Sequence, residues 1–429
     1  MLEPTRTKFY TYEDTDAPLL KGDYLEITNI LKKTLIEGFN LRIPLSMILA
    51  DNVLTIFFQE NPGYKDYQVI SISGADNNIY NREFRINSVN ENSINILVDE
   101  TFNAPPTNFG EITIKCAPLG FIKKFEEQGQ LVFTSPSWAG SVRIDDYRHT
   151  DWNTSWAKFA RIQIAADHSD VNTAIGTTTA SNTWMTTPST YEGQTYKYWV
   201  PYRIYASRSS GSSTDQASAP STAKRAWYIF GDEKGFYFIN NYYNPSPLSK
   251  DYFHYHYIGN YRPLAHEAVG FTHNSILLLS SYNNYYTSTS RTDAQINNFC
   301  RDYDGTYQGI IFNGYNVKDW FRLKPTLSYG QVYSGTITNQ SVPVNSEDNL
   351  GADILTPIFI EQVMNGSSSS TGFALVGLAR GVQSIATDVS NRDTSDYVIK
   401  NREIGSCLTY ITCGRNKDMF ATDIIKDWD

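Results

Sequence analysis

The sequence predicts a mainly β protein, with a small α+β N-terminal domain followed by antiparallel domains that are sandwich-like or otherwise rich in sheet. Two observations favour this class. Short apolar or alternating runs, separated by segments rich in Ser, Thr, Asn and Gly, follow one another along the chain and are typical of strands and turns. An apolar period of 3.6 residues, which marks an amphipathic helix, is convincing in one place. Helix content should therefore be low.

The one expected helix spans residues 23–40. Gly38 near its end indicates where it stops. Its apolar stripe should cover a small sheet formed by residues 52–118, with Leu31 and Leu35 facing that sheet. The stripe consists of Leu25, Ile27, Ile30, Leu31, Leu35 and Ile36. The strands expected in this part of the chain are 8–12, 52–59, 67–73, 83–90, 93–99 and 111–118.

The length of the chain predicts more than one domain. A chain of 429 residues is too long for one ordinary hydrophobic core. We expect an N-terminal α+β domain at 1–120, an aromatic-rich β domain at 121–270 and a C-terminal β-dominated domain at 271–429. Segments 206–224 and 364–372 are rich in Ser and Gly, which is typical of surface loops.

The stretch from 227 to 261 is the most aromatic part of the chain. Residues 226–230 and 235–240 are apolar runs on either side of a polar turn, which predicts a β-hairpin with buried strands. The residues expected in the core of this hairpin are Trp227, Phe230, Phe236 and Phe238.

The stretch after the hairpin alternates along one strand. Phe253, Tyr255 and Tyr257 fall on one face, and His254 and His256 fall on the other. Tyrosine packs like an apolar residue but keeps a polar tip, which suits half-wet contacts between subunits. We therefore expect a subunit interface in part of the set Tyr242, Tyr243, Tyr252, Tyr255, Tyr257 and Tyr261.

Composition limits the possible partners. A formal net charge of −9 argues against broad binding to nucleic-acid phosphates. No long apolar run and no signal-peptide core are visible, so no membrane span is expected and synthesis in a cytosol is expected. No Cys/His pattern indicates zinc, and the cysteines are expected as free buried thiols, although the last two could meet across a bend. They are Cys116, Cys300, Cys407 and Cys413.

Two groups of residues are candidates for chemistry. Asp145 and Asp146 are adjacent on a strand end, so they should point to opposite faces and form a turn or an ion pair with Arg143 rather than a catalytic pair. His254 and His256 could share a metal with Asp251 or His266, but histidines in an aromatic sheet are more often stacked.

Two further motifs carry less weight. Residues 302–305 resemble the opening of a calcium loop but lack its later acidic ligand. Residues 167–170 contain Asp, His and Ser side by side, whereas members of a catalytic triad converge from separate segments. No signature of a hydrolase, kinase, nucleotide-binding fold or metalloprotease is present. The sequence therefore predicts a protein without catalytic residues, metal or cofactor.

The order of several segments carries a family resemblance. They are KFYTYEDTDAPLLKGDYLEITNILKKTLIEGFN (8–40), EITIKCAPLGFIKKFEEQGQLVFTS (111–135), VRIDDY (142–147) with FARIQIAAD and RAWYIFGDEKGFYF (225–238), and PIFIEQV followed by FALVGLARGV (373–382). On these segments the chain resembles a family of structural proteins of tailed bacteriophages and prophages. The resemblance implies a virion component without catalytic residues, assembled in several copies in the host cytoplasm, whose partners are other virion proteins and copies of itself.

Three functions stay open at this point. The first is a non-enzymatic structural protein on the tail, neck or baseplate side of the particle. The second is a decoration protein associated with the capsid. The third is a module that binds or cleaves carbohydrate on the host surface, because exposed aromatic residues stack on sugars as well as on proteins.

Overall fold

A computed structural model describes the chain without interruption from residue 3 to residue 148, and as separate segments after that. These segments are 154–155, 158–178, 189–191, 194–196, 203–207, 223–242, 248, 253–263, 273–280, 309–313, 317–325, 355–364, 372–385, 398–403, 406–413, 418–423 and 428. The expected loops at 206–224 and 364–372 lie largely outside these residues.

The predicted mainly β class is confirmed. Strands make up 49% of the structure and helices 8%. All strand pairs of the described segments are antiparallel. One longer helical segment is present among them, with two short 3₁₀ turns, η2 (Asn78–Tyr80) and η3 (Phe109–Glu111).

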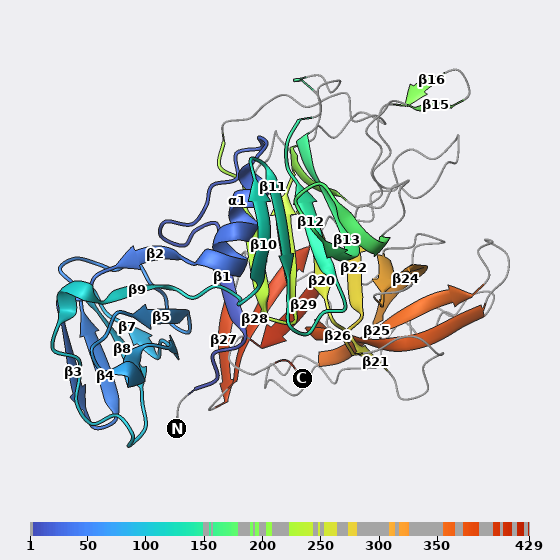
Figure 1. Cartoon of the computed structure of the whole chain (residues 1–429). Helices are drawn as coiled ribbons and strands as arrows, with labels where there is room; N and C mark the ends of the chain where they lie inside the picture. The colour runs from blue at the N-terminus through green and yellow to red at the C-terminus, as the bar shows by residue number, and fades with distance from the viewer. Residues whose placement is uncertain are drawn as a thin grey trace.

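Residues 39–116 form a compact N-terminal module of two four-stranded sheets, which stands to one side of the rest of the molecule (Figure 1). The first sheet has the order β2 (Phe39–Arg42), β9 (Thr113–Cys116), β5 (Val69–Ser73) and β6 (Glu83–Arg85). The second has the order β3 (Ser46–Ala50), β4 (Val53–Phe57), β8 (Ser93–Leu97) and β7 (Ser88–Val89). Isoleucines such as Ile56, Ile70, Ile96 and Ile114 are buried in the module.

Two strands of this module were not predicted. β2 lies where the expected helix was to end, and no strand was assigned to β3. The other strands fall within the expected segments, although the run 83–90 is divided between β6 and β7. The two missed strands therefore follow each other in the chain, and they form an edge of each sheet.

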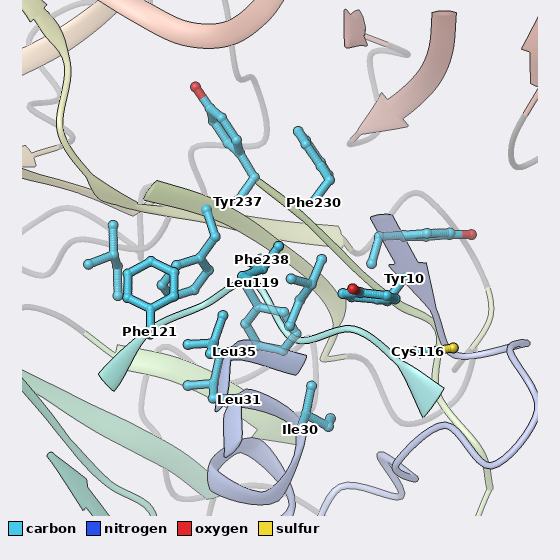
Figure 2. Packing of buried hydrophobic residues seen from close by; sticks show 14 of the residues in the cluster. Tyr10, Ile30, Leu31, Leu35, Cys116, Leu119, Phe121, Phe230, Tyr237 and Phe238 are labelled. Atoms are coloured by element: carbon cyan, nitrogen blue, oxygen red, sulfur yellow. The ribbon is translucent and has the colours of Figure 1, made fainter. Parts of the chain in front are cut away.

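The helix is shorter than predicted and covers a different sheet. α1 (Glu26–Lys32) continues as one π-helical turn, η1 (Lys33–Glu37), and ends at Gly38. Leu31 and Leu35 are fully buried, but they point toward Leu119, Phe121 and Phe238 (Figure 2). α1 contacts strands of the body of the molecule, and the expectation that it covers the sheet of residues 52–118 is wrong.

The chain returns along the helix after the N-terminal module, and this explains the difference. The amide of Leu119 donates to the carbonyl of Thr34 at 2.9 Å, and the amide of Phe121 donates to the carbonyl of Leu35 at 3.0 Å. These bonds tie residues 119–121 to the helix end, so the apolar stripe of the helix meets the next sheet in the sequence.

That next sheet has six strands, and its two faces differ in chemistry. Its strands are β10 (Ile122–Glu127), β11 (Gln130–Thr134), β12 (Ser141–Asp145), β13 (Lys158–His168), β14 (Ala174–Thr178) and β17 (Arg203–Ser207). One face carries apolar residues such as Phe133, Ile144 and Ile162. The opposite face, here called the polar face, carries Gln130, Ser141, Arg143, Asp145, Arg161, Gln163 and Arg203.

The largest sheet has thirteen strands. It contains β1 (Lys8–Thr11), β18 (Trp227–Asp232), β19 (Gly235–Asn241), β20 (Phe253–Gly259), β22 (Ile276–Ser280), β23 (Gly309–Phe312), β24 (Val317–Pro325), β25 (Leu355–Met364), β26 (Gly372–Ile385), β29 (Asp418–Asp423), β28 (Ser406–Cys413) and β27 (Val398–Glu403) in this order. β21 (Arg262–Pro263) pairs with β26, and β15 (Ser189–Tyr191) pairs separately with β16 (Gln194–Tyr196). The predicted hairpin is confirmed as β18 and β19.

The aromatic hairpin has a buried face on each side. Trp227, Phe236 and Phe238 are fully buried on the side of α1, where Phe236 meets Phe121 and Phe133. Phe230 and Tyr237 point the other way (Figure 2), and the Trp428 ring packs against both. The core positions predicted for the hairpin are therefore confirmed.

The sheet pairing connects all three expected domains. β1 pairs with β18, so the start of the chain joins the large sheet, and this sheet continues from β20 through β22 across residue 270. Pairing of strands does not by itself define a domain, and the boundaries at 120 and 270 stay a prediction.

Candidate functional site

The tyrosines expected at a subunit interface are inside the molecule wherever the structure describes them. Tyr242, Tyr255, Tyr257 and Tyr261 are each at most 2% exposed. Tyr243 and Tyr252 lie outside the described residues. For the four described tyrosines the interface prediction is wrong, because a side chain buried within its own chain offers no contact area to a partner.

Tyr257 and Tyr261 pack within the large sheet, and its C-terminal half covers Tyr261. Tyr257 lies 4.5 Å from Tyr237, measured between ring centroids, and its hydroxyl donates to the backbone carbonyl of Asn260. A Cβ on Gly377 of β26 would lie 2.5 Å from the ring of Tyr261, so the bare backbone of β26 packs directly on this tyrosine. The polar tip of Tyr257, which suggested a half-wet surface, is thus satisfied inside the fold.

A buried ion pair fixes this covering layer to the hairpin. Arg380 of β26 donates to both carboxylate oxygens of Asp232, at 3.1 and 2.7 Å, and to the carbonyl of Trp428 at 2.6 Å. The hydroxyl of Tyr237 donates to the backbone carbonyl of Arg380 at 3.0 Å. These contacts join strands far apart in sequence and hold the aromatic face closed.

The two histidines of β20 are stacked among aromatic rings. His254 lies 3.9 Å from the Tyr242 ring centroid, and His256 lies beside Phe238. Both are buried, and burial lowers the pKa of His256 to about 3, so it is neutral at physiological pH. No group of three metal-binding side chains occurs in the described part of the chain, and Asp251 and His266 lie outside it.

The two adjacent aspartates point to different surroundings. Asp145 lies on the polar face, 3.4 Å from Nε of Arg143 and 3.8 Å from a terminal nitrogen of Arg161. Burial raises the pKa of Asp145 to about 6, against the opposing effect of the two guanidinium groups. Asp145 is therefore in an ion pair with Arg143, which was one of the two interpretations drawn from the sequence.

Asp146 has a structural role that the sequence did not indicate. Its carboxylate accepts the amide hydrogen of Thr28 at 3.1 Å, and its carbonyl accepts that of Leu25. It thus satisfies amide groups at the start of α1 from a remote strand, which is the function that capping residues usually perform locally. Burial raises the pKa of Asp146 to about 7.

A serine and a histidine form a hydrogen-bonded pair that sequence spacing could not reveal. Ser141 Oγ lies 2.7 Å from Nδ1 of His168, and the two residues are 27 positions apart. Each is 1% exposed, and burial lowers the pKa of His168 to about 4. A nucleophile and a base at this distance are one element of acyl-transfer chemistry, but a substrate must also reach them. Their burial makes this pair part of the core.

The side chains of the Asp-His-Ser-Asp run at 167–170 do not form a common site. Asp167 pairs with Lys124 on β10, and Asp170 accepts the amide hydrogens of Asn172 and Thr173 in a turn. The calcium-like residues 302–305 lie outside the described part of the chain. Cys116 is a free buried thiol, as expected, and Cys300 is not described. Within the described residues, no helix has the length and apolarity needed to cross a membrane.

The most exposed apolar residues of the described chain lie close together in sequence, within the N-terminal module. Leu41, Ile43, Leu45 and Ile48 are 54–64% exposed and occupy β2, β3 and the connection between them. We call these four residues the apolar edge. Figure 1 shows β3 and β4 on the side of the module that faces away from the rest of the molecule. Exposed apolar residues gathered in one place mark interaction surfaces more often than scattered ones do.

Apart from Arg42, the apolar edge carries no charge along the chain. Residues 43–50 contain no charged side chain, and Arg42 before them is paired with Asp16 at 3.0 Å. Apolar residues at every second position, 41, 43 and 45, are the sequence signal that could have identified an exposed strand edge. That signal was hidden because the predicted helix extended to residue 40.

Comparison with known proteins adds no assignment. No family model matches the sequence, and no curated protein matches it either.

Proposed function

We propose that this chain is a non-enzymatic structural component of a tailed bacteriophage particle that acts through protein–protein contacts. The observation that carries the proposal is the apolar edge, where four large aliphatic side chains are more than half exposed and Arg42 is the only charged residue among them in the sequence. Such a patch is costly for an isolated molecule in water and is stabilised when a partner covers it. The family resemblance of the sequence gives the particle as the place of action.

The burial of two candidate catalytic arrangements in the described part of the chain supports a non-enzymatic role. Ser141 and His168 are buried together, and Asp145 is fully buried between arginines. Neither arrangement meets solvent, which a hydrolytic centre requires. Turnover of a polysaccharide or of peptidoglycan by the purified chain, abolished by Asp145→Asn or by Ser141→Ala, would contradict this part of the proposal.

The described residues give the carbohydrate-binding alternative no supporting observation. It depended on exposed aromatic rings, yet the exposed large apolar residues of the described chain are all leucine or isoleucine. Aliphatic side chains lack the flat face on which a sugar stacks. We therefore favour assembly through the N-terminal module, on the tail, neck or baseplate side of the particle, over contact with a host glycan.

The test is recovery of the chain in particles produced by the genome that encodes it. Wild-type chain should be found by mass spectrometry in gradient-purified particles, at a constant ratio to the other virion proteins. Ile48→Lys should reduce this recovery strongly, whereas Ile122→Lys should not. Ile48 and Ile122 are similarly exposed, at 54% and 49%, but Ile122 lies on β10, away from the apolar edge.

The two variants distinguish surface apolarity from the position of the patch. Absence of the wild-type chain from purified particles would overturn the proposal. Equal loss of both variants would show that the apolar edge has no special role in incorporation. A symmetric reconstruction of the particle then distinguishes a tail-side component from a capsid decoration protein by its copy number.

A further inference from the structure

β3 contains one residue of the apolar edge, Ile48, and one of its two sides has no paired strand among the described residues. Among the described residues β3 pairs with β4 alone, and the pairing runs without a register shift from Ser46 opposite Phe57 to Ala50 opposite Val53. A regular edge strand directs part of its amide and carbonyl groups outward, where another strand can bind them. Ile48 is exposed on the outer face, whereas Met47 is buried.

Other edges in this molecule carry the features that prevent such pairing. β10, at one edge of the six-stranded sheet, contains Lys123, Lys124, Glu126 and Glu127. β6 contains Glu83 and Arg85, and β7 is two residues long. β14 lies opposite a register shift in β13 and contains Gly176 at a φ of +72°. Charges, short strands and bulges are the usual protection of edges against unwanted pairing, and β3 has none of them.

The neighbouring edge strand β2 is partly covered. The side-chain amide of Asn40 and Nε of Arg42 donate to the carbonyl of Pro62, at 3.0 and 3.2 Å. The loop that contains Pro62 therefore lies against β2. Among the described residues, this leaves β3 as the open edge of the module, and the exposed Leu41, Ile43 and Leu45 precede it in the sequence.

We propose that β3 pairs antiparallel with β3 of a second copy of this chain across a two-fold axis. This inference rests on the proposed function, because it assumes that the apolar edge is an interface. It adds that the molecule bound there is a second copy of the chain. Two-fold contacts between identical surfaces are the commonest closed arrangement of identical chains. In such a pair the outer faces coincide, so Ile48 of both copies lies on one continuous face.

The lack of charge on β3 makes it a place where two copies can meet without local electrostatic repulsion. Each chain carries a formal net charge of −9, so two copies repel each other wherever their acidic surfaces meet. Residues 43–50 carry no charge, so this repulsion is weakest there. Antiparallel self-pairing brings identical residues close together, and like charges placed opposite each other destabilise a sheet. β3 contains no charged side chain, so self-pairing places no like charges opposite each other.

The first measurement is sedimentation of the full-length chain over a range of concentrations. Wild type should dimerise reversibly. Ile48→Lys should weaken the dimer by at least about tenfold, because it places two ammonium groups on one face at the pairing edge. Ile122→Lys should leave the dimer unchanged. Because Ile48 and Ile122 are both exposed, neither change should prevent folding, and thermal unfolding of both variants checks this.

Hydrogen exchange distinguishes strand pairing from a side-chain contact. Amides of residues 46–50 should become more protected when the concentration of wild-type chain rises above that at which it dimerises, and those of β10 should not. A chain that stays monomeric, or a dimer without added protection at 46–50, overturns the inference.

The inference and the proposed function can fail separately. A monomeric chain whose Ile48→Lys variant is still excluded from particles would show that a different virion protein occupies the edge, which overturns self-pairing and leaves the function standing. A dimer with protected β3 amides, formed by a chain that purified particles lack, would support self-pairing and overturn the function.

Discussion

The aromatic stretch 227–261 and the apolar edge of the N-terminal module differ in both residue type and position. The first is rich in tyrosines with polar tips, yet its described tyrosines are buried between layers of sheet. The second consists of leucine and isoleucine, yet it is more than half exposed. Polar tips do not show that a side chain meets water, because Tyr237 and Tyr257 donate to carbonyls of their own chain. Exposure without an internal partner is the better sign of an interface.

The largest expected effect on stability comes from removing the buried tyrosines. Replacing both Tyr255 and Tyr257 with Ala should destabilise the fold by at least about 5 kcal/mol, since each loss of a large buried ring costs about 3–5 kcal/mol. Trp227→Ala serves as a reference, because this side chain is fully buried and donates to the carbonyl of Pro18 at 3.0 Å. Urea unfolding measures all three free energies. A double variant as stable as wild type would mean that these tyrosines are exposed in the folded chain.

The next largest effect is expected at the ion pair that closes the aromatic face. Arg380→Ala leaves the carboxylate of Asp232 buried and without its cation, which should cost about 3–5 kcal/mol. Combining Arg380→Met with Asp232→Asn should recover much of the loss. The amide oxygen of Asn can still accept the amide hydrogens of Lys234 and Gly235, which now bind Asp232. Failure of the double variant to recover would mean that the guanidinium contact with Trp428 dominates.

A smaller effect, dependent on pH, is expected at Asp146. Burial raises its pKa from 3.8 to about 7, so the folded state binds this proton more tightly than the unfolded state does. The contribution of Asp146 to stability is then fully present below about pH 4 and is lost as pH rises through about 7. Asp146→Asn cannot ionise but keeps an oxygen for the amide of Thr28. Relative to wild type, this variant should gain stability as pH rises from about 4 to about 7.

The comparison for Asp146 needs only the difference between two unfolding curves at each pH. Any constant cost of burying an amide group shifts the variant equally at all pH values, and Asp145 titrates in both proteins. A difference that does not change with pH would show that Asp146 ionises in the folded chain much as it does in the unfolded chain.

Sequence patterns predicted the elements whose surroundings are local. The hairpin of β18 and β19 follows from two apolar runs around a polar turn, and its core residues were identified correctly. What covers a face depends on strands far away in sequence. Nothing near Tyr257 indicates that Arg380 and Trp428 close over the face it shares with Tyr237, and nothing near Ser141 indicates His168.

In the N-terminal module, the sequence-based prediction failed although the relevant pattern was local. The apolar edge was missed. The helical period of residues 25–36 was extended to residue 40, past the glycine at 38 that ends the helix. Leu41, Ile43 and Leu45 alternate with polar or small positions, but an exposed apolar strand edge is rare enough that such a run is normally assigned to the core.

The smallest stability effect is expected where the interface proposal is strongest. Ile48→Ala and Leu45→Ala should each change the free energy of unfolding by no more than about 0.5 kcal/mol, because these side chains already meet solvent in the single chain. Ile56→Ala in the neighbouring strand β4 is the matched control, since that isoleucine is fully buried and should cost about 2–5 kcal/mol. Unfolding is best followed at a concentration at which the chain is monomeric, so that dimer formation does not stabilise the wild type. A cost of several kcal/mol for Ile48→Ala under these conditions would mean that the apolar edge is packed within its own chain. The contrast with the buried tyrosines would then disappear, and the interface would have to be sought elsewhere on the molecule.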